Sequence, residues 1–250
     1  MSMNISTNYR NLSSGYIINS AADDAAGLSI TQRIETEKNG YDIGVENAEK
    51  GNNVLNVADG ALSSIYDQLS RIRELGVQAS NSAIYSKDEL KMMQSEIDQI
   101  KQGIADVAKN TQFNGLKLLD GSMATMELAT NPHGIGHEME MTNASLEELG
   151  IADFDVTKGF NLDDIDKALK KVSEAQSSIG AQSNRLAYTV MNNQYASYNM
   201  ESAISSMKDT DMIEEMSDLQ KNSILEQIQI QMQKKRMEEE EQKRQVIQVN

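Results

Sequence analysis

The sequence predicts a mainly α-helical protein, built as an elongated antiparallel coiled-coil helical rod with a small β-hairpin region. Apolar residues recur at heptad spacing over segments far longer than an ordinary globular helix. Proline, which breaks helices, occurs only once in 250 residues. Aromatic residues make up only 4% of the chain, so we expect thin bundles with cores of Leu, Ile, Met and Ala in place of a thick globular core.

The residue composition argues against several classes of function. The chain carries 38 acidic and 23 basic residues, a formal net charge of −15, which disfavours binding to nucleic acids and to anionic membranes. It has no cysteine, so it offers no disulfide, thiol nucleophile or thiolate metal site. We find no run of 18 apolar residues and no apolar segment at the N-terminus, so the sequence predicts neither a membrane span nor a cleaved secretory signal.

The first long helix is predicted from about residue 20 to 80. Asn19 or Ser20 is suited to cap it, with Asp23 and Asp24 in its first turn. A narrow seam of apolar and small residues runs along this helix, and its glycines allow a neighbouring backbone to come close. The seam consists of Tyr41, Gly44, Ala48, Gly51, Leu55, Ala58, Leu62, Ile65, Leu69, Ile72, Gly76 and Ala79.

Two further helices carry the same spacing. Ser86 and Glu89 form a capping box that predicts a helix over 87–109. Asn161 caps a third helix over 161–208, which we expect to run antiparallel to the first. The predicted rod-packing side chains of the three helices are Leu55, Leu62, Ile65, Leu69, Ile72, Leu90, Met93, Ile97, Ile100, Leu169, Val172, Ile179, Leu186 and Val190.

The segment 111–160 is the least helical part of the chain. It is rich in glycine, and we expect one or two small hairpins and a helical turn at 145–149. A short strand is predicted at 116–119, followed by a turn at 120–121. After the third long helix, residues 209–250 predict a further helix with a mixed-charge tail.

No catalytic, cofactor or metal site is predicted. His133, His137 and Glu138 lack the His-Glu-x-x-His spacing of a zinc protease. Neighbours such as Asp23 and Asp24 point about 100° apart on a helix, and no third ligand is evident. No nucleophile, base and orienting residue lie at compatible spacing, so the sequence does not predict an enzyme.

A second stripe runs one position away from the seam of the first helix. It consists of Gln68, Arg71, Leu75 and Gln78, and so combines charge, amides and one large apolar side chain. We expect Leu75 to be exposed beside Arg71. This stripe is therefore a candidate anchor for a partner.

Seven short motifs, in this order, closely resemble those of bacterial flagellins. They are 12–15 (LSSG), 18–28 (INSAADDAAGL), 71–75 (RIREL), 111–115 (TQFNG), 179–182 (IGAQ), 184–186 (NRL) and 209–212 (DTDM). The resemblance extends from about residue 4 to 233. It implies a rod domain over 19–208, built from two N-terminal helices, a β-hairpin and one long C-terminal helix. The chain ends, 1–18 and 209–250, would form inner helices.

The chain departs from the family pattern in two places. Only about 40 residues separate the hairpin from the last long rod helix, so we expect the outer domains to be absent. Eleven residues precede the 12–15 motif, where flagellins usually have some thirty. We therefore expect 1–18 to be a shortened inner segment that leaves the inner helix at 209–250 without its usual partner.

The resemblance implies a structural subunit of the bacterial flagellar filament, secreted by the flagellar export apparatus and assembling with copies of itself. It also implies an export chaperone and the filament cap as partners, no cofactor, and recognition by host Toll-like receptor 5. The receptor-binding residues implied by the match are Arg71, Leu75, Gln78 and Glu96. Two alternatives stay open: a minor hook-filament junction component, and a flagellin-like interaction protein that does not polymerise.

Overall fold

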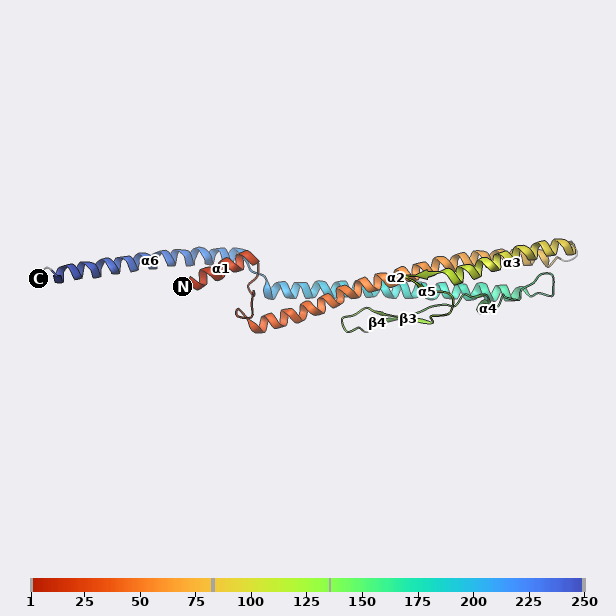
Figure 1. Ribbon diagram of the computed structural model, residues 1–250, viewed down its shortest axis with the longest axis horizontal. Coiled ribbons are helices and arrows are strands. Elements are labelled where there is room, and N and C mark those ends of the chain that lie inside the picture. The colour runs from red at the N-terminus through yellow and green to blue at the C-terminus, as the bar shows by residue number, and fades with distance from the viewer. Residues whose placement is uncertain (1, 82–83, 135, 249–250) are drawn as a thin grey trace. The chain divides into compact units, whose positions relative to one another are not determined.

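The computed structural model describes residues 2–81, 84–134 and 136–248, and it is mainly α-helical, as predicted (Figure 1). Two helices are very long: α2, Ala25–Ala79, has 55 residues, and α5, Leu162–Lys208, has 47. The other elements are the helices α1 (Ser2–Ser14), α3 (Lys87–Asn110), α4 (Leu146–Leu149) and α6 (Met212–Gln248), and the strands β1 (Gln112–Phe113), β2 (Leu116–Lys117), β3 (Thr125–Ala129) and β4 (Gly136–Glu140). The strands form two antiparallel pairs, β1–β2 and β3–β4.

The chain divides into two compact units, each of which is described by itself. Unit 1 comprises Met1–Lys38 and Tyr198–Asn250, and unit 2 comprises Asn39–Ser197. Both α2 and α5 contribute to both units, so the division falls within these helices. The boundaries predicted from the sequence, near residues 18 and 208, fall instead between α1 and α2 and at the end of α5.

In unit 2, α2 and α5 lie side by side and antiparallel (Figure 1). Gln176 of α5 donates a hydrogen bond to Ser63 of α2 over 2.9 Å. Further along α5, Ser183 donates to Asn52, over 2.6 Å. Residue numbers therefore fall along α2 as they rise along α5, which confirms the expected antiparallel orientation for this unit.

A single apolar core runs through unit 2, and the predicted rod-packing side chains lie in it or against it. The buried ones are Leu55, Leu62, Ile65, Leu69, Ile72, Ile97, Val172, Ile179 and Leu186, and the partly buried ones are Leu90, Met93, Ile100, Leu169 and Val190. The core also takes in Ala168 and Ala175, which the predicted rod-packing set omits. The buried stripe of α5 is thus broader than a two-stranded seam.

Local chemistry shapes the hairpins. Asn114 and Gly115 connect β1 to β2 with φ angles of 49° and 81°, the left-handed values that two-residue hairpin turns favour. The strand β2 covers only Leu116–Lys117, so it is shorter than the strand predicted at 116–119. At the end of β3, the carbonyl oxygen of Thr130 would lie 2.5 Å from a Cβ added to Gly44, so this glycine lets the backbone approach α2. Ser145 caps α4 at the predicted helical turn.

In unit 1, α2 begins at Ala25, later than predicted. Asp24 is its cap, because its carboxylate accepts hydrogen bonds of 3.0 Å from the backbone N–H groups of the two residues after Ala25. Asp23 accepts instead from the backbone N–H groups of Asn19 and Ser20. The predicted cap at Asn19 or Ser20 is therefore wrong, because these residues form a polar turn ahead of the helix.

Candidate assembly surfaces

In unit 1, α1 pairs with the start of α6 through amide side chains. Asn8 and Asn11 are both buried, and their Nδ2 atoms donate to Glu215 Oε1 over 2.7 and 3.3 Å. Asn222 in turn donates to Asn8 over 3.1 Å. The prediction that this inner helix lacks a partner is therefore wrong for its first turns.

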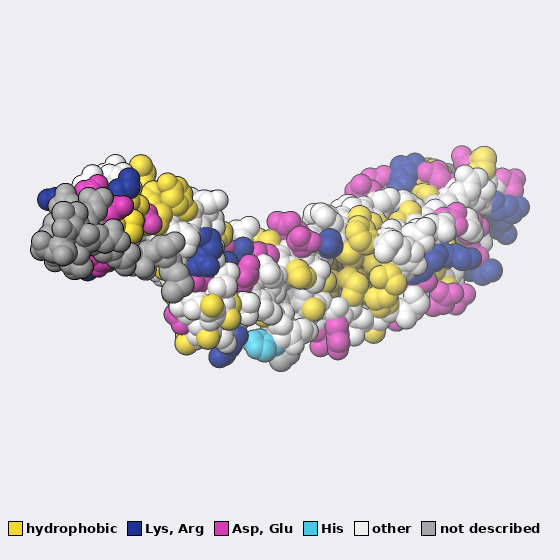
Figure 2. All heavy atoms as spheres, turned by 60° about the vertical axis from the view of Figure 1, so that its left-hand side comes forward, with side chains coloured by type: hydrophobic (Ala, Val, Ile, Leu, Met, Phe, Trp, Pro, Cys, Tyr) yellow, Lys and Arg dark blue, Asp and Glu magenta, His cyan; other side chains and the backbone are white. Residues whose placement is uncertain are grey.

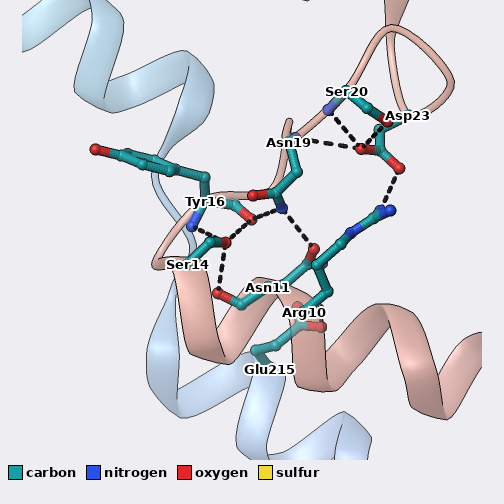
Figure 3. A network of polar contacts seen from close by, with 8 residues as sticks. All are labelled: Arg10, Asn11, Ser14, Tyr16, Asn19, Ser20, Asp23 and Glu215. Atoms are coloured by element: carbon teal, nitrogen blue, oxygen red, sulfur yellow. Dashed lines mark hydrogen bonds and ion pairs between the residues drawn. The ribbon is translucent and has the colours of Figure 1, made fainter.

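A polar network ties the segment after α1 to these helices (Figure 3). The Nδ2 atom of Asn19 donates to Asn11 Oδ1 over 3.2 Å and to the Tyr16 carbonyl over 2.7 Å. Arg10 forms an ion pair with Asp23. The hydrogen bond from the Ser20 side chain is the largest influence on the pKa of Asp23, which it lowers, and Arg10 acts in the same direction. These polar contacts hold the segment between α1 and α2 against α1.

Beyond Asn222, α6 presents large apolar side chains to solvent. These exposed residues are Ile224, Leu225, Ile228, Ile230, Met232 and Met237. Three of them, Ile224, Ile228 and Met232, recur at four-residue spacing and so share one side of the helix. A row of this kind indicates a surface that another helix covers.

In unit 2, the structure brings Arg71 and Glu96 together but buries Leu75. Arg71 Nε and Nη2 donate to Glu96 Oε1 over 2.9 and 2.8 Å, and Nη1 donates to Glu74 over 3.0 Å. The bond to Glu96 is the main reason why the pKa of Arg71 is raised. Leu75 is only 3% exposed, so the expected exposed anchor is wrong: α2 packs against both α3 and α5, which widens its buried side.

Sequence reasoning missed a bare aromatic surface on α5. Tyr188, Met191 and Tyr195 are 73%, 50% and 65% exposed, and Arg185 lies beside them, also exposed. We call these four residues the aromatic face. Figure 2 shows hydrophobic side chains reaching the surface in several patches among polar ones. The signal in the sequence was a gap in charge, because Arg185 is the single charged residue from Ala175 to Ser197.

His137 lies in β4 and joins the β3–β4 hairpin to α5. Its Nε2 atom is 2.6 Å from Thr189 Oγ1, and the Thr189 hydroxyl donates to the Arg185 carbonyl over 3.0 Å. His137 Nε2 must therefore carry the proton. The Nδ1 atom is buried without a hydrogen-bond partner among the described residues. Burial, with a smaller effect of Arg185, lowers the pKa of His137.

Neither a metal centre nor a membrane span emerges from the described part of the chain. Within residues 2–81, 84–134 and 136–248, no three His, Cys, Asp or Glu side chains cluster closely enough to hold a metal ion. In the same ranges, every helix is too short or too polar to cross a bilayer.

Long paired helices with bare apolar sides and small hairpins define a helical structural protein. The pattern of the bacterial flagellin N-terminal helical region matches residues 2–124, and that of the bacterial flagellin C-terminal helical region matches 162–243. A flagellin of Halalkalibacterium halodurans is 37% identical over 223 residues, which cover 86% of this chain and 82% of the relative. The chain belongs to the bacterial flagellin family, whose members are structural proteins and not enzymes.

Further relatives agree with this assignment. The flagellar filament 33 kDa core protein of Treponema phagedenis is 34% identical over 249 residues, covering 90% of this chain and 86% of the relative. The crystal structure of Bacillus cereus flagellin shares the fold, with a TM-score of 0.53 at 23% identity, covering 59% of this chain and 88% of that one. Between β2 and α5 the described residues form only β3, β4 and α4, consistent with a short flagellin without outer domains.

Proposed function

We propose that this flagellin is a structural subunit of the bacterial flagellar filament and assembles with copies of itself through its helices. The observation that carries the proposal is the apolar row on α6, Ile224, Ile228 and Met232, whose side chains stay exposed although α1 pairs with the start of this helix. Large apolar side chains at this spacing lose contact with water when a second helix packs on them. The filament core protein named among the relatives supports the same role.

Electron microscopy of the purified chain under polymerising conditions tests this function. We expect filaments from the wild type, and none from the double variant Ile224→Glu/Ile228→Glu, because two buried carboxylates oppose helix packing. The matched control is Gln227→Glu/Gln231→Glu, which adds the same charge to exposed polar positions of the same helix and should still polymerise.

Other assembly outcomes favour the two alternatives. Short oligomers that stop growing would indicate a minor hook-filament junction component. A wild type that stays monomeric at every concentration would indicate an interaction protein that does not polymerise, and would contradict the filament role. Sedimentation velocity on the same samples distinguishes these outcomes.

Family membership supports a further proposal: recognition by Toll-like receptor 5 through Arg71, Gln78 and Glu96. Gln78 is exposed, and the Arg71–Glu96 pair lies across α2 and α3 with both side chains about half exposed. Because Leu75 is buried, it would support this surface from below. We expect Arg71→Ala and Glu96→Ala to weaken signalling in a receptor reporter assay.

Arg73 provides a matched control for the receptor surface. It also forms a half-exposed interhelical ion pair, with Asp166 of α5 at 2.6 Å, so Arg73→Ala removes a similar contact elsewhere. Equal potency of the Arg71→Ala variant and the wild type would remove the receptor role and leave the filament role unaffected.

Export through the flagellar secretion apparatus, with an export chaperone and the filament cap as partners, is proposed from family membership alone. The chain should remain inside cells that lack the export apparatus. Its appearance in their culture medium would contradict this route.

A further inference from the structure

We infer that the aromatic face of α5, formed by Arg185, Tyr188, Met191 and Tyr195, binds α2 of a second copy of this chain. The inference rests on the proposed filament function and names one contact within it. The argument uses the position of the face on its helix, its composition and its charge.

The aromatic face lies opposite the side of α5 that packs on α2 of its own chain. Leu186 and Asn193 are buried, whereas Tyr188 and Tyr195, each two positions further along, are largely exposed. A step of two residues turns a helix by about 200°, so the two sets point in opposite directions. In a single chain, the aromatic face is therefore exposed to solvent.

The composition of the aromatic face is that of an interface core. Such cores are depleted in charged residues and enriched in Tyr, Met and Arg, and Tyr and Arg often dominate the binding energy. At the chain's average of 24% charged residues, the segment from Ala175 to Ser197 would carry about five, yet it carries only Arg185. A shallow hollow lined by Asn184, Arg185, Tyr188 and Asn192 lies within the same surface.

Charge identifies the second copy as the occupant. Arg185 forms no ion pair with any described residue. When an interface covers a guanidinium, a carboxylate of the partner can accept its charge-assisted hydrogen bonds. Copies of this chain are rich in carboxylates, with a net charge of −15. The aromatic face thus offers the positive charge that an acidic helix of the same protein needs.

Within the chain, α2 offers a surface of matching character. Ile43 and Val57 are exposed apolar residues about four turns apart, and Glu46 lies on the same side between them. Among the described residues, Glu46 forms its ion pair with Lys50, at 3.4 Å, and a solvent-exposed pair of this kind contributes little to stability. We assign Glu46 as the partner of Arg185, with Ile43 and Val57 packing against the aromatic side chains.

The contact joins two different surfaces, the aromatic face of one copy and α2 of the next. In a pair joined by such a heterologous contact, one copy keeps its aromatic face free and the other keeps its α2 surface free. Further copies can therefore add at both ends, and the contact repeats without closing. This geometry suits an open helical filament. A contact between two aromatic faces would instead stop at a dimer.

The first test measures the concentration above which the full-length chain forms sedimentable filaments. We expect Tyr188→Ser/Tyr195→Ser to raise this concentration at least about tenfold, since the pair forms the centre of the contact. Tyr66→Ser, at another exposed tyrosine, should stay within about twofold of the wild type. Arg185→Glu should also impair assembly, and Glu46→Arg in the same chain should restore it at least in part.

The second test uses the absence of cysteine and does not require filaments. We expect a bismaleimide to cross-link an Asn184→Cys variant to a Lys50→Cys variant when the two are mixed. The control mixture pairs Lys50→Cys with Gln99→Cys, which is exposed on α3, and it should give much less cross-linked product. Linkage without filaments would support the contact and contradict the filament role. Filaments in which the tyrosine variants assemble normally and no linkage occurs would overturn the contact and leave the filament role standing.

Discussion

The two units pair their helices by different chemistry. In unit 2, α2 and α5 share a core of fully buried Leu and Ile side chains, whereas in unit 1 the contact between α1 and α6 centres on Asn8, Asn11 and Glu215. Apolar burial contributes stability roughly in proportion to area. A buried hydrogen bond contributes little net stability, but it penalises every misaligned arrangement. Unit 2 is therefore built for stability, and the helix pair of unit 1 for a defined alignment.

The largest effect is expected from the core of unit 2. Leu62 is fully buried on α2, so Leu62→Ala should lower the free energy of unfolding by about 2–5 kcal/mol. The measurement is urea denaturation followed by circular dichroism. Val57→Ala removes an exposed apolar side chain of the same helix and serves as the control. Equal losses in the two variants would contradict a core-based unit 2.

A smaller loss is expected where the hairpin backbone approaches α2. Gly44→Ala should cost about 1–3 kcal/mol, because the new Cβ would lie 2.5 Å from the Thr130 carbonyl oxygen. Gly60→Ala, on the same helix with open space around it, should instead stabilise by about 0.5–1 kcal/mol. Thermal melts of the two variants should therefore shift in opposite directions, and a shared direction would refute the close approach.

In unit 1, Glu215→Ala should release α1 with little effect on unit 2. The change leaves the amides of Asn8 and Asn11 without their acceptor, at a cost of about 1 kcal/mol. Hydrogen exchange should quicken in α1, while α3 stays protected. Glu214→Ala, at an exposed neighbouring position, is the control. Faster exchange throughout unit 2 would show that the two units are not separable in this way.

The smallest effect is a pH dependence at His137. Its pKa is lowered in the folded state, so the unfolded chain binds more protons and stability rises with pH in that window. The stabilisation is present above the unfolded pKa, about 6.5, and is lost as pH falls from there toward the lower folded value. Unfolding midpoints at several pH values should show a slope that His137→Gln removes and His133→Gln keeps. A slope that persists in the His137→Gln variant would assign it to other groups.

Sequence reasoning succeeded where the chemistry is local and failed where several elements compete. The capping box of Ser86 and Glu89 is present because its two partners lie three residues apart. The start of α2 was missed because several adjacent residues can cap a helix, and Asp23 is occupied by the turn and by Arg10. Such a choice depends on contacts from elsewhere in the chain.

On the candidate surfaces too, the features that depend on several elements could not be predicted from the sequence. The burial of Leu75 was missed because heptad spacing assumes a single partner helix, whereas α2 has two in unit 2. The Arg71–Glu96 bond depends on α3 folding back, which a seam pattern alone does not locate. The charge gap around Arg185 could be seen in the sequence, but only the exposure of Tyr188 and Tyr195 distinguishes a surface from a core.

The aromatic face also bears on how assembly responds to ionic strength. Copies with a net charge of −15 repel one another, and at about 1 M salt this repulsion is screened beyond about 3 Å. A contact centred on tyrosine and methionine keeps its hydrophobic contribution under the same conditions. Added salt should therefore promote growth of the polymer, the reverse of its effect on proteins held together by surface ion pairs.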